Sequence, residues 1–225
     1  MIYAMSDLHG CYDKYKEMLK KINLTEKDTL YILGDVVDRG DGGIKILFDM
    51  MKRKNVVPLL GNHDYVAFSV LKHLMKETKP DWWDEIRAGW FQDGGEVTEK
   101  AFMELKENEK KEVVDFITDF HVYKTIKVGE NRFLLSHAGL AHYENAKTFD
   151  AYELYDFITG RMDYHKVYSE DFYFVSGHTP TALIDQNYAG KIYRKNKHIA
   201  IDCGAVFGYP LGCICLDHMQ EFYVE

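Results

Sequence analysis

The sequence predicts an α/β fold, and two repeated patterns support that prediction. Short apolar runs rich in β-branched and aromatic residues recur along the chain, as expected for buried strands. Between the early runs, apolar residues recur at helical spacing. This alternation favours parallel strands joined by right-handed crossovers, and ligands of such folds gather at the carboxyl ends of the strands.

Eight runs are the predicted strands. Three lie in the first part of the chain, at residues 2–5, 29–33 and 56–60. The others lie beyond residue 130, at 132–136, 172–176, 198–202, 212–216 and 221–225. The residues before the run at 198–202 resemble a hairpin, with the turn at Ala189-Gly190 or at Lys195-Asn196.

Two amphipathic helices are expected between the first three strands. Their apolar stripes are Tyr15, Met18, Leu19 and Ile22, then Ile44, Leu47, Phe48 and Met51. From about Tyr65 to Val122 helical stripes dominate, which predicts a helical insert inside a single domain spanning residues 1–225. All three tryptophans lie in this insert, where packing into a core is the favoured interpretation and one wall of a substrate groove the alternative.

The bulk properties exclude several classes of function. The 225 residues are 46% hydrophobic, which indicates a globular protein with a large core. A formal net charge of −8 argues against nucleic acid as a partner, since such proteins hold the phosphate backbone with excess Lys and Arg. No stretch approaches the roughly 20 apolar residues of a membrane span, and no export signal is recognisable. We therefore expect no membrane association, reduced cysteines and a cytoplasmic location.

Five polar motifs follow predicted strands directly. They are DLHG at 7–10, GDVVDRG at 34–40, GNHD at 61–64, SHAG at 136–139 and GHTP at 177–180. Each motif alone is common loop sequence, but five in this order predict a shared site at the strand ends.

The donor atoms in these motifs suit two divalent cations held close together. Asp7 and His9 can face one cation, and Asp35 offers a carboxylate that bridges both. The second cation would be completed by Asn62, His137 and His178. Imidazole ligands favour manganese, with iron and zinc as the alternatives. A water molecule shared by the two cations would ionise at neutral pH and attack phosphorus directly as hydroxide.

Three further motif residues suit phosphate chemistry. Arg39 presents a planar fork of donors for two phosphate oxygens, and Arg161 in FITGRMDY is the candidate for a second arginine. His63 is placed to protonate the leaving oxygen, while Asp38 orients its ring.

At these motifs the chain resembles the calcineurin-like metallophosphoesterase superfamily, and within it the phosphoprotein phosphatase family of Ser/Thr phosphatases, including bacterial and phage members. The resemblance implies a central β-sandwich of two mixed sheets flanked by helices. It also implies one metal on Asp7, His9 and Asp35. The second metal would bind Asp35, Asn62, His137 and His178. His63 and Asp38 would form the acid pair, and Arg39 and Arg161 would contact the phosphate.

Two details of the motifs bear on the subfamily. Many nucleases and phosphodiesterases of this superfamily end with Gly-His-x-His, whereas here the motif is GHTP, and Arg39 stands in DRG; both favour the phosphatase branch. The chain departs from family patterns at Asp64, where Glu is usual in eukaryotic members, at Cys11 after DLHG, and beside Arg161, which lacks a neighbouring tryptophan.

The leading hypothesis is a phosphomonoester hydrolase acting on phosphoserine or phosphothreonine in proteins, or on a small phosphate ester. Its enzymatic alternative is a symmetrical dinucleoside tetraphosphatase or another nucleotide phosphohydrolase, which needs a pocket for adenine. A non-catalytic phosphate-binding module is the remaining alternative, disfavoured because every candidate ligand and the acid are present.

Overall fold

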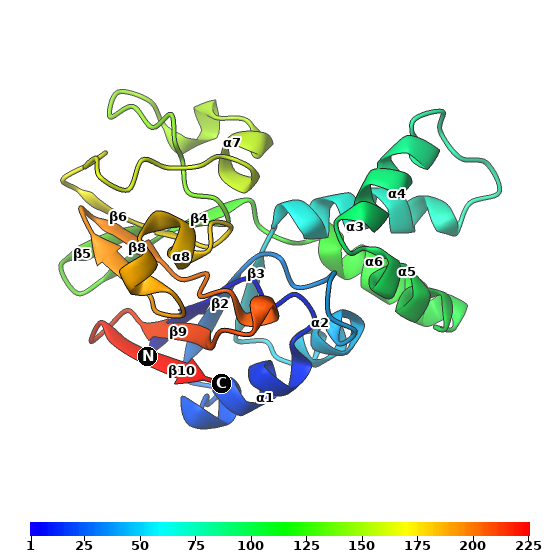
Figure 1. Cartoon of the computed structure of the whole chain (residues 1–225), viewed down its shortest axis with the longest axis horizontal. Coiled ribbons are helices and arrows are strands. Elements are labelled where there is room, and N and C mark those ends of the chain that lie inside the picture. The colour runs from blue at the N-terminus through cyan, green and yellow to red at the C-terminus, as the bar shows by residue number, and fades with distance from the viewer.

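The computed structural model describes residues 1–225 and contains two five-stranded sheets packed face to face (Figure 1). The first sheet has the order β10-β9-β1-β2-β3. Its strands are β1 (Ile2–Met5), β2 (Thr29–Leu33), β3 (Val56–Leu59), β9 (Leu211–Cys215) and β10 (Gln220–Val224). β1, β2 and β3 are parallel, whereas β9 runs antiparallel to both β1 and β10.

The second sheet has the order β4-β5-β6-β8-β7. Its strands are β4 (Tyr123–Val128), β5 (Asn131–Ser136), β6 (Phe172–Ser176), β7 (Tyr193–Lys195) and β8 (His198–Ala200). β5, β6 and β8 are parallel, and the two edge strands are antiparallel to their neighbours. Both sheets are therefore mixed, as the family resemblance implied.

Helices cover the outer face of the first sheet and extend beyond it. α1 (Tyr12–Lys21) and α2 (Gly43–Met51) pack on the sheet with the predicted apolar stripes inward. The insert forms four helices, α3 (Asn62–Leu74), α4 (Trp83–Gln92), α5 (Glu96–Met103) and α6 (Glu107–Thr118), to the right of the sandwich in Figure 1. None of the helices combines the length and apolar character needed to cross a bilayer.

Short elements complete the second sheet's outer face and the C-terminal half. They are the helices α7 (Leu154–Ile158) and α8 (Thr181–Ile184) and the 3₁₀ turns η1 (Phe149–Ala151), η2 (Gln186–Tyr188) and η3 (Ala205–Phe207). α7 contributes Phe157 and Ile158 to a third cluster of buried side chains on that face. The segment that carries α7 lies above the second sheet in Figure 1.

The core between the sheets is apolar and fixes their relative position. Ala4, Leu33 and Leu59 of the first sheet lie in one buried cluster with Phe133, Leu135 and Val175 of the second. A larger cluster joins the first sheet to α1, α2 and the insert. Burial on both faces explains why the parallel strands read as continuous apolar runs.

The predicted fold class is confirmed, with one strand missed. β4 is a half-buried edge strand whose lysines at 124 and 127 interrupt its apolar pattern, so the run was not recognised. Of the two predicted turn positions, Lys195-Asn196 is the closer, because Lys195 pairs with His198 across the β7–β8 hairpin.

Candidate metal centre

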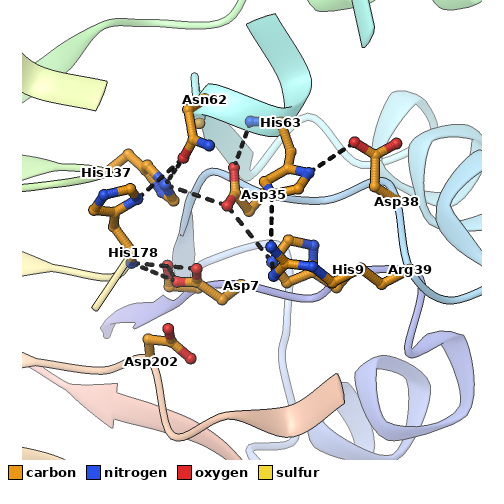
Figure 2. A network of polar contacts seen from close by, with 12 residues as sticks. Asp7, His9, Asp35, Asp38, Arg39, Asn62, His63, His137, His178 and Asp202 are labelled. Carbon is orange, nitrogen blue, oxygen red and sulfur yellow. Dashed lines mark hydrogen bonds and ion pairs between the residues drawn. The ribbon is translucent and has the colours of Figure 1, made fainter. Parts of the chain in front are cut away.

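Six parallel strands, three from each sheet, end at one place in the sandwich. The residues that follow them, in strand order β1, β2, β3, β5, β6 and β8, are Asp7, Asp35, Asn62, His137, His178 and Asp202. Figure 2 shows these six side chains converging from opposite sheets. The two-sheet architecture thus brings together donors separated by almost the whole chain.

The backbone is strained where these side chains are presented. Ten non-glycine residues have positive φ, and six of them are predicted site residues: Asp7, His9, Asp35, Asp38, Arg39 and His178. Such conformations cost about 1–3 kcal/mol each and persist where the surrounding structure holds them. This concentration of strain marks the strand ends as a functional site.

One half of the centre is built around Asn62, His137 and His178. The Asn62 Oδ1 atom lies 2.9 Å from His137 Nε2 and 3.0 Å from His178 Nδ1, and His137 Nε2 lies 3.3 Å from Asp35 Oδ2. These donor atoms all face one point, at the left of Figure 2. The arrangement brings together the four ligands expected for the second metal.

The other half contains Asp35 with two imidazoles. His9 Nε2 lies 3.5 Å from Asp35 Oδ2, and the donor atoms of His9, Asp35 and His63 all lie within 4.8 Å of one another. Asp7 lines the same cavity, but its carboxylate accepts hydrogen bonds from the Ser6 hydroxyl and the His178 backbone N–H. Asp35 is therefore shared by both groups of donors, and His63, which is predicted to act as the acid, lies in the group with His9.

The histidines are oriented as in metal sites. The Nδ1 atoms of His9 and His137 lie 3.0 and 2.7 Å from the carbonyl oxygens of Val37 and Leu33, respectively. Hydrogen bonds from Nδ1–H to these carbonyls direct Nε2 toward the centre of the site, a common arrangement around metal-binding histidines. Oxygen and imidazole donors of this kind fit manganese, iron or zinc.

Burial and mutual charge set the protonation of these groups. Burial lowers the pKa values of His9 and His178 to about 4, so both imidazoles are neutral at pH 7 and able to bind a cation. Burial also raises the pKa of Asp7 to about 6. Burial also opposes the charged forms of Asp35 and His137, but the opposite charge of each outweighs this effect on the other. The pKa of Asp35 is therefore lowered and the pKa of His137 is raised.

Asp64 holds two of the strand-end loops in register. Its carboxylate accepts hydrogen bonds from the backbone N–H groups of Asp35, Val36 and Gly61, at 2.8, 2.9 and 3.1 Å. Gly61 packs so closely that a Cβ there would lie 2.1 Å from Asp35 Oδ1. The Asp found where eukaryotic members carry Glu thus has a structural function at the base of the site.

His63 and Asp38, the residues predicted to act as an acid pair, are in contact, and side chains of the insert bind the carboxylate. His63 Nδ1 lies 2.8 Å from Asp38 Oδ2, on the right of Figure 2. The same carboxylate accepts from Trp90 Nε1 at 2.7 Å and from the Thr98 hydroxyl at 2.7 Å. Burial alone would lower the pKa of His63, but the hydrogen bond to Asp38 and the charge of Asp35 raise it above its ordinary value.

Both predicted arginines line the cavity. Arg39 Nη1 lies 2.7 Å from His9 Nε2, and Arg39 Nη2 lies 2.9 Å from His63 Nε2. Arg161 lies three residues beyond α7 and reaches the cavity from the opposite sheet. Positive charge thus flanks the candidate metal centre from both sides.

Three residues that line the cavity, Asp202, Asp93 and Phe207, are not among the predicted site residues. Asp202 is buried at the end of β8, and its Oδ1 accepts from the Gly204 N–H at 2.9 Å. The strand-end rule used for the other motifs would have found it. Asp93 and Phe207 also line the cavity. They lie in the segments GWFQDGGEVT and IDCGAVFG, which also resemble family members, but no chemical role follows from those segments alone.

Comparisons with known proteins agree with this geometry. A sequence model of the family described as calcineurin-like phosphoesterase matches residues 1–205. A relative from Buchnera aphidicola, named bis(5'-nucleosyl)-tetraphosphatase, symmetrical, is 30% identical over 156 residues, which are 68% of this chain and 50% of that protein. The chain spans about half the length of such curated relatives.

A second relative matches over most of its length. The asymmetrical bis(5'-nucleosyl)-tetraphosphatase PrpE of Halalkalibacterium halodurans is 25% identical over 233 residues, covering 92% of this chain and 86% of that protein.

Solved structures share the fold at low sequence identity. A crystal structure described as that of a diadenosine tetraphosphatase candidate has a TM-score of 0.69 at 17% identity, covering 99% of this chain and 92% of the other. A Ser/Thr protein phosphatase from Saccharomyces cerevisiae has a TM-score of 0.61 at 14% identity, covering 94% and 71%. The family match over residues 1–205 and the shared fold establish that this chain belongs to the calcineurin-like phosphoesterase family.

Proposed function

We propose that the protein is a phosphohydrolase that uses two divalent cations, most readily manganese. The observation that carries this proposal is the position of Asp35, whose carboxylate belongs to both groups of donor atoms. Asp7 and His9 would complete one cation site with Asp35. Asn62, His137 and His178 would complete the other. Bound divalent cations would neutralise phosphate oxygens and lower the pKa of a coordinated water molecule.

The remaining residues of the cavity have distinct proposed tasks. Arg39 and Arg161 would bind the phosphate oxygens and orient phosphorus toward the attacking water. His63 would donate a proton from Nε2 to the leaving oxygen once phosphate draws Arg39 Nη2 away from that atom, since its Nδ1 is engaged by Asp38. Asp38 would keep that imidazole in the tautomer and orientation required for the transfer.

For the substrate, we propose the phosphoanhydride of a dinucleoside polyphosphate. The named relatives support this choice, since those matched in sequence are tetraphosphatases of this kind. Phe207 adds support from the cavity itself: it is 59% exposed, and the Arg39 guanidinium lies 5.4 Å from its ring centroid. An exposed ring beside a phosphate-binding arginine can stack on a nucleobase.

A phosphoserine or phosphothreonine protein is the second candidate substrate, and the polar lining of the cavity favours it. The insert places no tryptophan over the cavity: Trp83 and Trp90 are buried, Trp82 is exposed but does not line it, and the lining residues from the insert are Asn62, His63 and Asp93. Phe207 is thus a single exposed phenyl ring at the polar entrance of the cavity, and an extended peptide can reach such a site.

Parallel assays with manganese separate these proposals. We expect hydrolysis of an aryl phosphate, a larger kcat/KM for diadenosine tetraphosphate than for a phosphothreonine peptide, and nucleoside diphosphates as products if cleavage is symmetrical. A preference for the phosphopeptide would replace the proposed substrate class. Absence of all three activities in metal-loaded protein would contradict the phosphohydrolase proposal.

A further inference from the structure

The insert places one carboxylate at the mouth of the candidate active site. Asp93, directly after α4, has Oδ1 3.1 Å from Arg39 Nη2 and Oδ2 3.4 Å from His63 Nε2. Its side chain is 61% exposed, so it is neither a buried structural group nor part of either donor cluster. The Asp93 carboxylate therefore contacts both Arg39, which is proposed to bind phosphate, and His63, which is proposed to protonate the leaving oxygen.

The backbone fixes the position of this carboxylate. The Arg39 N–H donates to the Gly94 carbonyl at 2.9 Å, which joins the turn after α4 to the arginine itself. Gly94 has φ +95, and a Cβ there would lie 2.8 Å from Arg39 Cγ. Because the turn is packed against Arg39, Asp93 stays beside the guanidinium by construction of the fold rather than by a chance surface ion pair.

The consequence is electrostatic. A phosphate dianion bound by Arg39 would place its negative charge within a few ångströms of the Asp93 carboxylate. Like charges at such separations in a partly exposed site repel each other. Asp93 also satisfies one donor of Arg39, and an incoming phosphate must replace that contact.

We propose that Asp93 is a specificity-determining residue that weakens binding of phosphate dianions and disfavours leaving groups carrying additional negative charge. The inference rests on the proposed phosphohydrolase function but not on its substrate class. In hydrolysis, the attacking water gives one proton to solvent and its oxygen forms the new bond to phosphorus. The bond to the leaving oxygen breaks with its electron pair on that oxygen, which takes the proton from His63 Nε2, and His63 regains a proton from solvent. A leaving group with a further phosphate brings its charge beside Asp93, whereas an alkyl or aryl group does not.

Removal of the charge alone tests the proposal. In Asp93→Asn, which keeps the shape, we expect inorganic phosphate to inhibit aryl phosphate hydrolysis by the manganese-loaded enzyme with a Ki lower by about 3- to 10-fold. Glu85→Gln removes an exposed charge from the same helix without touching the cavity and should leave the Ki unchanged. An unchanged or higher Ki in Asp93→Asn would overturn the proposal and show instead that Asp93 holds Arg39 in place.

A second measurement examines the leaving group. We expect the ratio of kcat/KM for diadenosine tetraphosphate to that for an aryl phosphate to rise by about 3- to 10-fold in Asp93→Asn. A ratio that stays constant would contradict the leaving-group part of the inference. Calorimetric binding of inorganic phosphate to the manganese-loaded variants needs no turnover, so failure of the hydrolase proposal and failure of this inference give different results.

Discussion

Thr98 of α5 makes two hydrogen bonds with Asp38. Its hydroxyl donates to Asp38 Oδ1 at 2.7 Å and accepts from the Asp38 backbone N–H at 2.9 Å. Trp90 Nε1 donates to the other carboxylate oxygen, the one that also contacts His63. The helical insert, far from the parallel strands in sequence, thus determines how the proposed acid pair is held.

Replacement of Thr98 tests this relationship. Thr98→Val keeps the shape but leaves two polar groups of a buried residue unpaired, each at a cost of about 1–3 kcal/mol. We expect kcat to fall about 10-fold with poor leaving groups, with metal content unchanged. Thr98→Ser retains the hydroxyl and should recover most of the activity. Equal loss in both variants would show that the side-chain methyl group matters rather than the hydrogen bonds.

Much of the fold and half of the site follow from local sequence patterns. Strands buried on both faces read as apolar runs, and polar residues directly after parallel strands converge, which places Asp7, Asp35, Asn62, His137 and His178 together. The contacts of Trp90, Asp93 and Thr98 do not follow, because they depend on how the insert packs against the loop after β2. No local periodicity of the sequence predicts that packing.

The tryptophans illustrate the limit. Burial of Trp90 in a core was the favoured interpretation, and the ring is indeed 3% exposed. Its indole N–H nevertheless points to Asp38, so the residue both packs and supports the proposed acid. Composition can indicate that an aromatic residue is buried, but it carries no information on the partner of its polar atom.

Asp35→Asn is expected to remove metal binding and turnover together. The side-chain amide carries no charge and one oxygen, so it cannot serve both groups of donors. Metal content after dialysis should fall from about two cations per chain to less than one. Asp41→Asn, an exposed neighbour in sequence, is the matched control and should keep both cations. Full metal content in Asp35→Asn would remove the basis of the two-cation proposal.

The substitution His63→Asn distinguishes a role of His63 as a catalytic acid from a role as a metal ligand. As an acid, His63 matters most when the leaving group is poor, so hydrolysis of an alkyl phosphate should fall about 100-fold and that of an activated aryl phosphate much less. Metal content should stay near that of the wild type. Loss of a cation instead would mean that the proximity of His63 to His9 and Asp35 reflects coordination. His73→Asn on the same helix should change neither quantity.

Asp202→Asn should make the metal-free protein more stable. Burial and the nearby charge of Asp7 raise the Asp202 pKa well above its ordinary value, so ionisation at neutral pH costs folding free energy. An asparagine oxygen can still accept from the Gly204 N–H. We expect Tm in EDTA to rise by about 2–4 °C, corresponding to about 1 kcal/mol. A fall in Tm would show that the carboxylate has a stabilising partner.

Asp49 links α1 to α2 and provides a pH-dependent test of stability. Its carboxylate accepts from the Tyr15 hydroxyl at 2.9 Å and pairs with Lys16 at 2.7 Å, and Arg53, two residues beyond the end of α2, contacts it as well. Partial burial would raise the pKa of Asp49, but Arg53, Lys16 and Tyr15 together lower it to about 2. The folded pKa is thus below the value of about 3.9 expected in the unfolded chain.

This depressed pKa gives the sign of the effect. The contribution of ionised Asp49 is fully present above about pH 4 and is lost as the pH falls toward 2. Asp49→Asn should therefore lower Tm by about 2–4 °C at pH 7, and the difference from the wild type should shrink steadily below pH 4. Asp115→Asn, which breaks an exposed pair with Lys111, should change Tm by less than about 1 °C. A Tm difference for Asp49→Asn that grew on acidification would contradict the assignment of the stabilising charge to this carboxylate.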